Sequence, residues 1–357
     1  MMDVGARTPS QRRGAARGRI FAALAGTLAA ILLALAGCGS PGMIAGSGRL
    51  PEVPARVTPT PIPPISFPQD EAPHHNLTEW WYYTGHLRGT DAQGNAHTYG
   101  FELTFFQTLR GQFPPYYAAH YAVSDITRGQ FHYDQRAVLG SLRDIPPPGS
   151  RQGFALSVGG WQASGLDGHD HLAATMPDYA IDLSLTGRKP AVLHGGTGVI
   201  TYGPAGFSYY YSRPLMSITG TVSDHGMAVG VSGVAWMDHQ WGDFISLAGS
   251  GWDWYSLQLD NNTEYMLYVI RDSQKRPIST VGTFVAPDGA ASDLPGQDIL
   301  TQPTGSWTSP VTGGTYPSGW TITVASQQLT LVIKPLLLDQ ELVTARSTGV
   351  AYWEGAV

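Results

Sequence analysis

The sequence is poor in charge and nearly devoid of cysteine and lysine. Charged residues make up 13% of its 357 positions, about half of the ~25% that is usual in soluble proteins. Its one cysteine has no partner for an intramolecular disulfide. With three lysines, Lys189, Lys275 and Lys334, the chain offers no basic face for a phosphate backbone, which argues against nucleic-acid binding. The composition also excludes a coiled coil, which would be rich in Ala, Glu, Lys and Leu.

Aromatic residues are abundant instead. The chain holds 10 Trp, 17 Tyr and 11 Phe, together with 44 Gly and 26 Pro. A disordered chain would have few aromatics. Aromatic and β-branched residues punctuated by Gly favour β-structure. The composition therefore predicts a β-protein with a large apolar surface to bury.

The amino terminus has the pattern of a processing signal. Five arginines precede an apolar run that extends from Ile20 to Ala36. A basic region followed by a short apolar run is typical of a secretory signal peptide. The run ends in Leu35-Ala36-Gly37-Cys38, which is similar to a bacterial lipobox. We expect residues 1–37 to be a lipoprotein signal peptide and Cys38 to be the lipidation site. The alternative is a single membrane anchor, for which the run is shorter than the ~20 residues that a span needs.

The residues after Cys38 predict a tether. Removal of residues 1–37 leaves 16 basic and 26 acidic side chains. Residues 38–70 are rich in Pro, Gly, Ser and Thr, a composition that gives a semi-extended linker. We therefore expect an extracytoplasmic lipoprotein of the cell membrane, whose N-terminal lipid anchor is its membrane partner.

The remainder of the chain is predicted to be all-β. Segments that alternate apolar and polar residues are separated by turns such as Asp224-His225-Gly226 and Asp260-Asn261-Asn262. Many short antiparallel strands are typical of a sandwich or barrel. We expect two consecutive β-barrels or sandwiches. The predicted strands include Trp80–Arg88, His97–Leu109, Tyr116–Thr127, Phe154–Ala163, Tyr179–Thr186, Phe207–Val222, Met227–Met237, Trp252–Leu259, Glu264–Arg271, Ser279–Ala286, Gly319–Ala325 and Gln328–Pro335.

The first of these strands is bulky on both sides. Because side chains alternate along a strand, Glu79, Trp81 and Tyr83 share one face. The opposite face holds Trp80, Tyr82, Thr84 and His86. We therefore expect this strand to be covered on both sides.

Three carboxylates lie among aromatic residues in the predicted strands. They are Glu79, Glu102 and Asp238. A carboxyl group that is desolvated among aromatic rings has a raised pKa and can act as a general acid. The alternative is that these groups are buried structural partners, of Arg213 in the simplest case. For Asp238 the adjacent His239 and flanking tryptophans favour a functional role.

Other chemistries lack their motifs. The sequence contains no Gly-x-Ser-x-Gly and no His-Glu-x-x-His pattern. His169-Asp170-His171 could place two imidazoles on one strand face, but no third ligand is evident. We therefore expect neither a metal nor a cofactor.

Four segments carry a family resemblance. They are Glu79-Trp80-Trp81-Tyr82-Tyr83-Thr84-Gly85-His86-Leu87, Tyr99-Gly100-Phe101-Glu102-Leu103-Thr104-Phe105-Phe106, Tyr210-Tyr211-Ser212-Arg213 and Trp236-Met237-Asp238-His239-Gln240-Trp241-Gly242. In this order the chain resembles the CrtC/AttH family of lipocalin-like proteins, which includes carotenoid 1,2-hydratases. The resemblance implies two lipocalin-like domains, 71–246 and 247–357, with a ligand cavity between or within them.

The resemblance also implies a reaction. A hydro-lyase of this type hydrates a C=C bond of an isoprenoid or lipid. Asp238 would donate the proton, and His239 or Glu102 would orient or deprotonate the water. The apolar ligand, the expected small-molecule partner, would be bound by Trp80, Tyr82, Trp236, Trp241 and Tyr211. The alternative is a non-catalytic extracytoplasmic protein that binds a lipid or another hydrophobic ligand.

Overall fold

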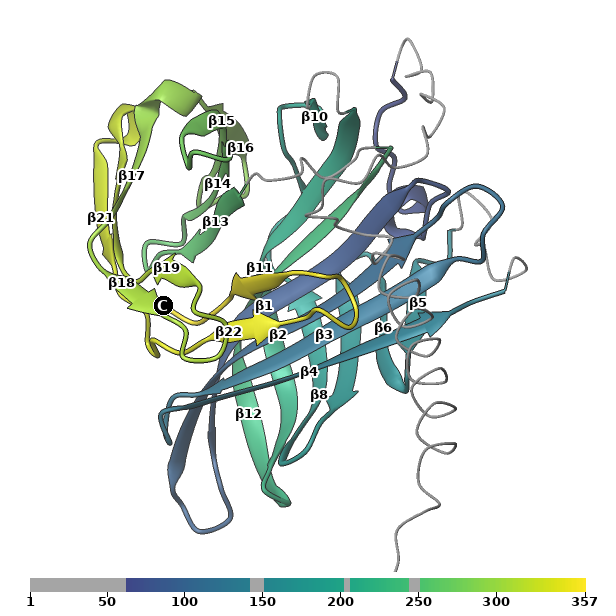
Figure 1. Cartoon of the computed structure of the whole chain (residues 1–357), viewed down its shortest axis with the longest axis vertical. Coiled ribbons are helices and arrows are strands. Elements are labelled where there is room, and N and C mark those ends of the chain that lie inside the picture. The colour runs from purple at the N-terminus through teal and green to yellow at the C-terminus, as the bar shows by residue number, and fades with distance from the viewer. Residues whose placement is uncertain (1–61, 142–150, 202–205, 244–250) are drawn as a thin grey trace, which may run out of the picture. The chain divides into compact units, whose positions relative to one another are not determined.

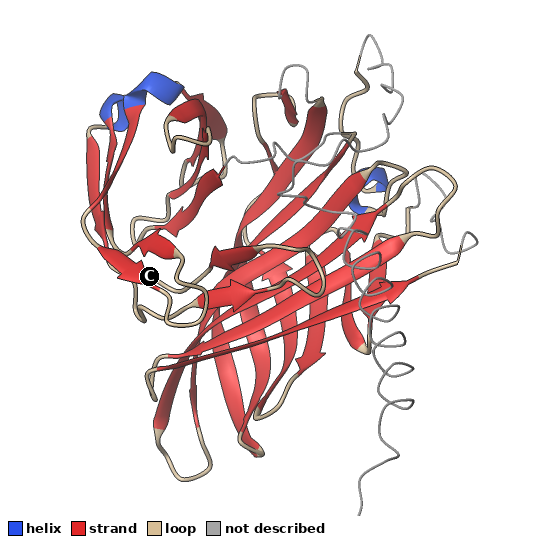
Figure 2. Ribbon diagram, in the orientation of Figure 1, coloured by secondary structure: helices blue, strands red, loops and turns tan. Residues whose placement is uncertain are grey.

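Nearly all of the regular structure is β-strand (Figure 1, Figure 2). The computed structural model describes residues 62–141, 151–201, 206–243 and 251–357. Within these ranges the helical elements are the three-residue 3-10 turns η1 (Gln69–Glu71), η3 (Gly296–Asp298) and η4 (Ala325–Gln327). No helix in this part of the chain has the length and hydropathy that a bilayer crossing requires. The all-β prediction is confirmed, whereas the predicted signal peptide, Cys38 and most of the linker lie outside the described residues.

The main sheet has twelve strands. Its order is β4-β3-β2-β1-β12-β11-β8-β7-β6-β5, and β9 and β10 also pair with β11. Each of these pairs is antiparallel. The strands are β1 (Thr78–Thr90), β2 (Ala96–Thr108), β3 (Tyr116–Asp125), β4 (Gln130–Leu139), β5 (Phe154–Val158), β6 (Trp161–Leu166), β7 (His169–Thr175), β8 (Tyr179–Gly187), β9 (Val192–Leu193), β10 (Val199–Thr201), β11 (Phe207–Asp224) and β12 (Met227–Gly242).

The two ends of this sheet meet. Strands β4 and β5 contact each other, and Arg136 of β4 donates a hydrogen bond to the carbonyl of Gly159, just after β5. The same guanidinium lies 4.3 Å from the ring centroid of Trp161 and donates to the carbonyl of Thr175 at 2.9 Å. The sheet is therefore a nearly closed barrel, an arrangement that protects strand edges.

The inner face of the barrel is the main hydrophobic core. Burial alternates along β1 as the sequence predicts, with Glu79, Trp81, Tyr83 and Leu87 buried on one side. Large side chains from other strands, such as Trp161, fill the same core. Fully burying one large apolar side chain stabilises the fold by about 1.5–3 kcal/mol. We call this side of the sheet the inner face and the opposite side, which carries Tyr82, the outer face.

The strands after the main sheet form smaller sheets. A four-stranded sheet has the order β13-β14-β15-β16, and a three-stranded sheet has the order β17-β20-β21. The pairs β18-β19 and β22-β23 complete this region. A second core surrounds Leu267, Trp320 and Ile322. The strands are β13 (Gly251–Gln258), β14 (Glu264–Arg271), β15 (Pro277–Val285), β16 (Ala291–Leu294), β17 (Ile299–Pro303), β18 (Ser306–Thr308), β19 (Thr315–Pro317), β20 (Trp320–Val324), β21 (Leu329–Ile333), β22 (Glu341–Val343) and β23 (Ala351–Trp353).

The predicted boundary at 246/247 falls in residues 244–250, which lie outside the described ranges. Strands before and after it belong to different sheets. The division into two lipocalin-like domains, 71–246 and 247–357, stays a prediction.

Local turn chemistry explains where prediction and structure agree and differ. The predicted hairpin turn between β11 and β12 has positive φ at His225 (51°) and Gly226 (81°), as a tight hairpin turn requires. The prediction of a single strand over Phe154–Ala163 is wrong, because Gly159 and Gly160 adopt φ of 57° and 90° and separate β5 from β6. The prediction that β12 ends at Met237 is also wrong, because its ladder with β1 continues to Gly242.

Candidate functional site

The predicted site residues lie on two faces of the main sheet. Asp238 pairs in register with Tyr82 and Ser212, whereas His239 pairs with Trp81 and Tyr211. Because successive residues of a strand point to opposite sides, Asp238 lies on the outer face and His239 on the inner face. The outer face also carries Glu102, Trp80, Tyr82 and Trp236, whereas Trp241 and Tyr211 belong to the inner-face core. The structure therefore does not bring His239, Trp241 and Tyr211 together with Asp238.

Asp238 is buried and accepts three side-chain hydrogen bonds. Ser212 donates to its Oδ1, and the indole Nε1 of Trp236 donates to the same oxygen at 2.6 Å. The hydroxyl of Tyr210 donates to Oδ2 at 2.8 Å. Burial raises the pKa of Asp238 to about 6, although the three donors oppose this shift by stabilising the carboxylate. The group can therefore hold or release a proton close to neutral pH.

A second layer of polar side chains fixes these donors. Nε2 of His194 lies 2.6 Å from Oγ of Ser212, and its Nδ1 lies 2.8 Å from Oγ1 of Thr283. Burial lowers the pKa of His194 to about 3, so its imidazole is neutral. A neutral imidazole that donates from Nε2 leaves the Ser212 hydrogen for Asp238. Trp254 on β13 donates to the hydroxyl of Tyr210 at 3.0 Å.

Two further carboxyl groups share the outer face. Glu102 on β2 accepts from Thr104 at 2.6 Å and from Tyr352 at 3.1 Å, and Glu354 accepts from Tyr82 at 2.7 Å. Burial raises the pKa of Glu102 to about 7. Burial and then the negative charges of Glu102 and Asp238 raise the pKa of Glu354 to about 8. We call Asp238, Glu102 and Glu354 the acidic cluster. Burial raises the pKa of all three carboxyl groups towards or above neutrality, and like charges add to this shift at Glu354.

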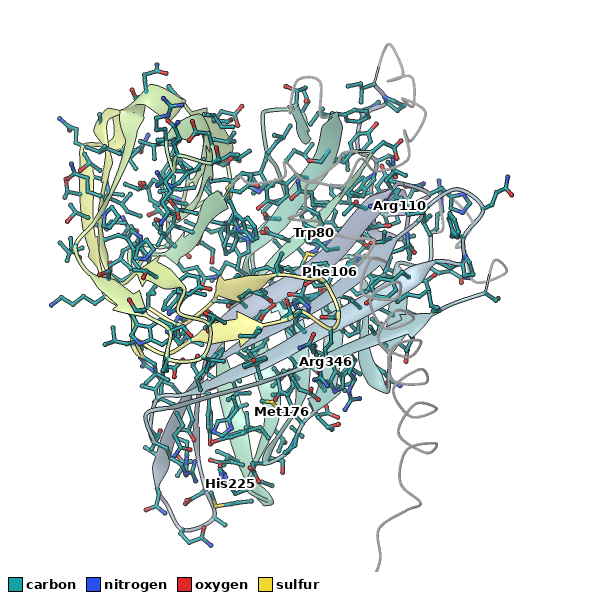
Figure 3. The ribbon with its side chains drawn as sticks, in the orientation of Figure 1. Trp80, Phe106, Arg110, Met176, His225 and Arg346 are labelled. Atoms are coloured by element: carbon teal, nitrogen blue, oxygen red, sulfur yellow. The ribbon has the colours of Figure 1, made fainter. Side chains whose placement is uncertain are left out.

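Aromatic rings surround the acidic cluster. Trp254 packs edge-on against Tyr82, with centroids 5.2 Å apart, and against Trp236, with centroids 6.2 Å apart. Trp80 and Phe106 are cross-strand neighbours on the same face (Figure 3) and are half-buried. These half-buried rings lie on the same face of the sheet as Asp238 and Glu102.

Two surface hollows lie away from this cluster. One, of about 390 Å³, is lined by Met176, Tyr179 and His225. The other, of about 540 Å³, is lined by Gln135, Val343 and Arg346. Figure 3 labels Met176, His225 and Arg346. Neither hollow includes a member of the acidic cluster. The ligand cavity that the resemblance implies stays a prediction.

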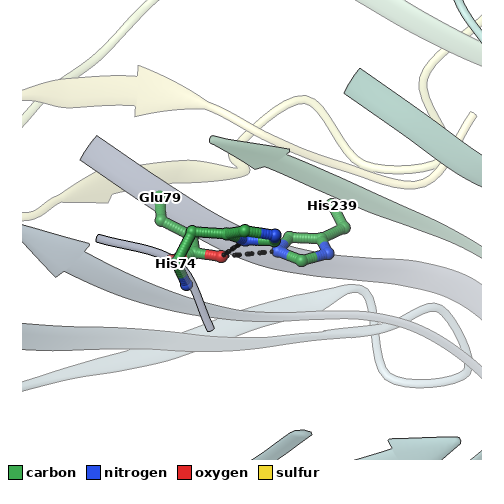
Figure 4. Close-up of side chains that lie close together, drawn as sticks. All are labelled: His74, Glu79 and His239. Atoms are coloured by element: carbon green, nitrogen blue, oxygen red, sulfur yellow. Dashed lines mark hydrogen bonds and ion pairs between the residues drawn. The ribbon is translucent and has the colours of Figure 1, made fainter. Parts of the chain in front are cut away.

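The inner face carries a different cluster (Figure 4). Oε1 of Glu79 lies 2.8 Å from Nδ1 of His74 and 2.8 Å from Nε2 of His239. The ring of His74 stacks on Trp241, with centroids 4.0 Å apart, and the ring of His239 stacks on Trp81, with centroids 4.5 Å apart. Glu79 therefore pairs with the two histidines and not with Arg213.

The prediction that Arg213 pairs with one of the three sequence-selected carboxylates is wrong. Its guanidinium donates to Glu71 in η1, and both side chains are buried. Arg213 pairs in register with Met237 and so points to the inner face. That orientation carries it away from Asp238 and Glu102.

Two members of the site carry no signal in the sequence. Glu354 and Tyr352 follow the strands of the main sheet by more than one hundred positions and lie in no recognisable motif. Tyr210 and Ser212 do stand in one of the four segments, but nothing local assigns them to Asp238. Strand register counted from the β11–β12 hairpin would not have done so. The ladder shifts by one residue between Arg213 and Met216, and without that shift Arg213 rather than Ser212 would lie opposite Asp238.

Comparison with known proteins settles the family. Residues 58–357 match the AttH-like family. The chain belongs to this family. No curated protein sequence matches it.

Two solved structures resemble this AttH-like chain. An AttH protein from Nitrosomonas europaea is 28% identical, with a TM-score of 0.73 over 86% of this chain and 93% of the other. Kievitone hydratase from Nectria haematococca is 17% identical, with a TM-score of 0.62 over 79% of this chain and 83% of the other. The predicted family and lipocalin-like fold are confirmed.

Proposed function

We propose that this AttH-like protein binds an unsaturated apolar small molecule, an isoprenoid or lipid, at the outer face and adds water to one of its C=C bonds. The observation that carries the proposal is the acidic cluster itself. Three buried carboxyl groups with pKa values raised to about 6, 7 and 8 lie among aromatic rings. Paired titratable groups poised in this way are typical of acid–base catalysis. The fold shared with kievitone hydratase supports the same class of reaction.

The reaction needs one acid and one base. The carboxyl proton of Asp238 is transferred to one carbon of the double bond, which leaves a carbocation on the other carbon. The π faces of Trp236 and Tyr82 stabilise the cation by about 0.5–2 kcal/mol for each contact. A water molecule then forms the new C–O bond, and Glu102 takes its surplus proton. The product is an alcohol, and proton exchange within the cluster and with water restores Asp238.

The cellular setting is part of the proposal. Lipidation of Cys38 would hold the protein on the extracytoplasmic side of the cell membrane, next to a supply of apolar substrates. The linker over residues 38–70 would let the barrel reach the membrane surface.

The Asp238→Asn variant tests the catalytic assignment. The amide keeps the shape of the side chain but cannot donate the carboxyl proton. We expect water addition to an acyclic isoprenoid polyene, followed by mass spectrometry, to fall at least ~100-fold. Binding of the polyene, followed by quenching of tryptophan fluorescence, should be retained. Asp182→Asn is the matched control, because Asp182 is exposed on the surface.

Two outcomes would contradict the proposal in different ways. If Asp238→Asn hydrates the polyene as fast as the unaltered protein, Asp238 is a structural group. If the unaltered protein binds the polyene and returns it unchanged, the protein is a non-catalytic carrier. Asp238 accepts from three donors, which stabilise its carboxylate; this is the observation that favours the carrier.

A further inference from the structure

We propose that His74, Glu79 and His239 form a binding site for a divalent transition-metal ion. These residues offer three ligand atoms that lie within 4.8 Å of one another. The site is on the inner face, so it is separate from the acidic cluster and does not depend on the proposed hydration reaction.

The ligand atoms converge on one point (Figure 4). Nδ1 of His74 and Nε2 of His239 each lie 2.8 Å from Oε1 of Glu79. Ligand atoms bound to one ion at about 2.0–2.2 Å are separated by roughly 3 Å, so a small displacement of the side chains would accommodate the ion. Two imidazoles and one carboxylate are the protein ligands of many catalytic zinc sites and of non-haem iron sites.

The second ring nitrogen of each histidine, which would not bind the ion, already has a hydrogen-bond partner. Nε2 of His74 lies 3.3 Å from Oδ1 of Asp70, and Nδ1 of His239 lies 3.3 Å from the hydroxyl of Tyr211. Metal-binding histidines usually bond a carboxylate or another polar group in this way through the second ring nitrogen. The bonds fix each ring so that its other nitrogen faces the proposed ion.

The second oxygen of Glu79 is also held. Oε2 accepts from the backbone N–H of His74 at 2.8 Å and from Nε2 of Gln107 at 3.0 Å. Oε1 is therefore the oxygen that would bind the ion. Ligand orientation by such partners is part of most protein metal sites.

Charge and packing also suit a divalent cation. Glu79 and Asp70 supply two carboxylates, whose charge a divalent ion balances without a proton on either imidazole. Trp81 stacks on His239 and Trp241 stacks on His74, which restricts both rings. The His74 side chain is 12% exposed while those of Glu79 and His239 are fully buried, so an ion would enter past His74.

A search for sequence motifs would not find these three ligands, because the last one is distant in the sequence. Glu79 is five positions after His74, and His239 is 160 positions after Glu79. His74 lies in the segment before β1, Glu79 lies in β1, and His239 lies in β12. A bound ion would therefore fasten the segment that precedes β1 to the two strands.

Cobalt binding by the whole chain tests the proposal. The metal-stripped protein is titrated with Co²⁺, followed by its visible d–d absorption, and bound Zn²⁺ is measured by elemental analysis after dialysis. We expect one equivalent of either ion. His74→Gln should weaken binding by at least ~10-fold, whereas His75→Gln, which changes an exposed histidine one position away, should bind like the unaltered protein.

The alternative is a metal-free network in which protons alone link the histidines to the carboxylates. Less than one equivalent of Co²⁺ and of Zn²⁺ on the unaltered protein would establish that network and overturn the metal site. Equal binding by His74→Gln would do the same. If His74→Gln does not fold, Glu79→Gln replaces it, and the Co²⁺ spectrum of the unaltered protein still decides between the two arrangements.

Discussion

Asp238 and His239 are consecutive residues that belong to different networks. Asp238 accepts from Ser212 and Tyr210 on the outer face, while His239 bonds Glu79 on the inner face. One strand, β12, thus carries the proposed proton donor on one side and a proposed metal ligand on the other. Substitutions at the two positions should therefore have separable effects. A change at Asp238 should affect hydration of the ligand, and a change at His239 should affect the core of the barrel.

The hydration rate should depend on pH in a bell-shaped manner. Catalysis requires a protonated Asp238 and an ionised Glu102. Because the pKa values are raised to about 6 for Asp238 and about 7 for Glu102, this is the minor singly protonated form, and its population is greatest between these two values. The rate should fall below about pH 6, where both are protonated, and above about pH 7, where both are ionised. Initial rates at constant ionic strength measure the profile.

Ser212→Ala tests which side of the bell-shaped pH–rate profile, its acidic or its alkaline limb, reflects the titration of Asp238. Loss of this donor destabilises the carboxylate, so the pKa of Asp238 should rise and the acidic limb should move to higher pH. Ser217→Ala on the same strand, whose hydroxyl bonds a backbone carbonyl, should leave the limb in place. An unmoved limb in Ser212→Ala would assign it to another group.

Glu102→Gln should stabilise the protein at high pH. Burial raises the pKa of Glu102 from 4.5 to about 7, so the folded state binds this proton more tightly than the unfolded state. Its contribution to the free energy of unfolding is therefore present at acidic pH and is lost as pH rises through about 7. At pH 8 we expect the variant to gain roughly 1–3 kcal/mol in urea denaturation, and the gain should vanish at pH 4.

The control for Glu102→Gln is Asp182→Asn at an exposed position. It should show no such pH-dependent gain. A Glu102→Gln variant that is less stable at pH 8 than the unaltered protein would mean that its hydrogen bonds outweigh the desolvation of its charge.

Arg213→Met should destabilise the fold strongly. The substitution leaves Glu71 buried without its guanidinium partner, which typically costs about 3–5 kcal/mol. The double variant Arg213→Met, Glu71→Met should recover much of the loss. Arg276→Met, at a surface ion pair with Asp272, should leave the free energy of unfolding nearly unchanged, because solvent screens such pairs. An additive double variant in chemical denaturation would argue against coupling.

Two glycines of β12 should respond differently to alanine. A Cβ at Gly233 would collide with the backbone carbonyl of His86 on β1, whereas a Cβ at Gly230 has no heavy atom within 4 Å. We expect Gly233→Ala to lose roughly 1–3 kcal/mol because the β1–β12 pair must shift. Gly230→Ala should be neutral or slightly stabilising. Thermal unfolding compares the two, and similar melting temperatures would contradict the close strand packing.

The sequence predicts the strands better than it predicts their partners. The alternation Glu79, Trp81, Tyr83 was sufficient to assign the faces of β1, because its period is two regardless of context. Strand β4 is hard to predict, because its half-buried and exposed residues carry little apolar alternation. The break between β5 and β6 depends on backbone angles that two glycines permit but do not require.

Prediction of the site failed where chemistry depends on register. Asp238 and His239 are neighbours in the sequence, which predicts one site for both. Strand β12 continues past Met237, so their side chains point to opposite faces of the sheet. Glu354 could not be selected, because its raised pKa results from burial beside residues that are distant in sequence. The sequence does not reveal Glu71 as the partner of Arg213, because the buried environment of Glu71, in a short turn before β1, is set by tertiary contacts.

The hydrogen bond between Tyr82 and Glu354 joins positions that are 272 apart in the chain. Contacts of such long range form slowly, because closing a long loop costs conformational entropy before the contact stabilises the chain. During refolding, the main sheet should gain its β-structure before the outer face gains its third carboxyl group. Hydration activity would then return last during refolding, so the rate at which it recovers would report the slowest step of folding.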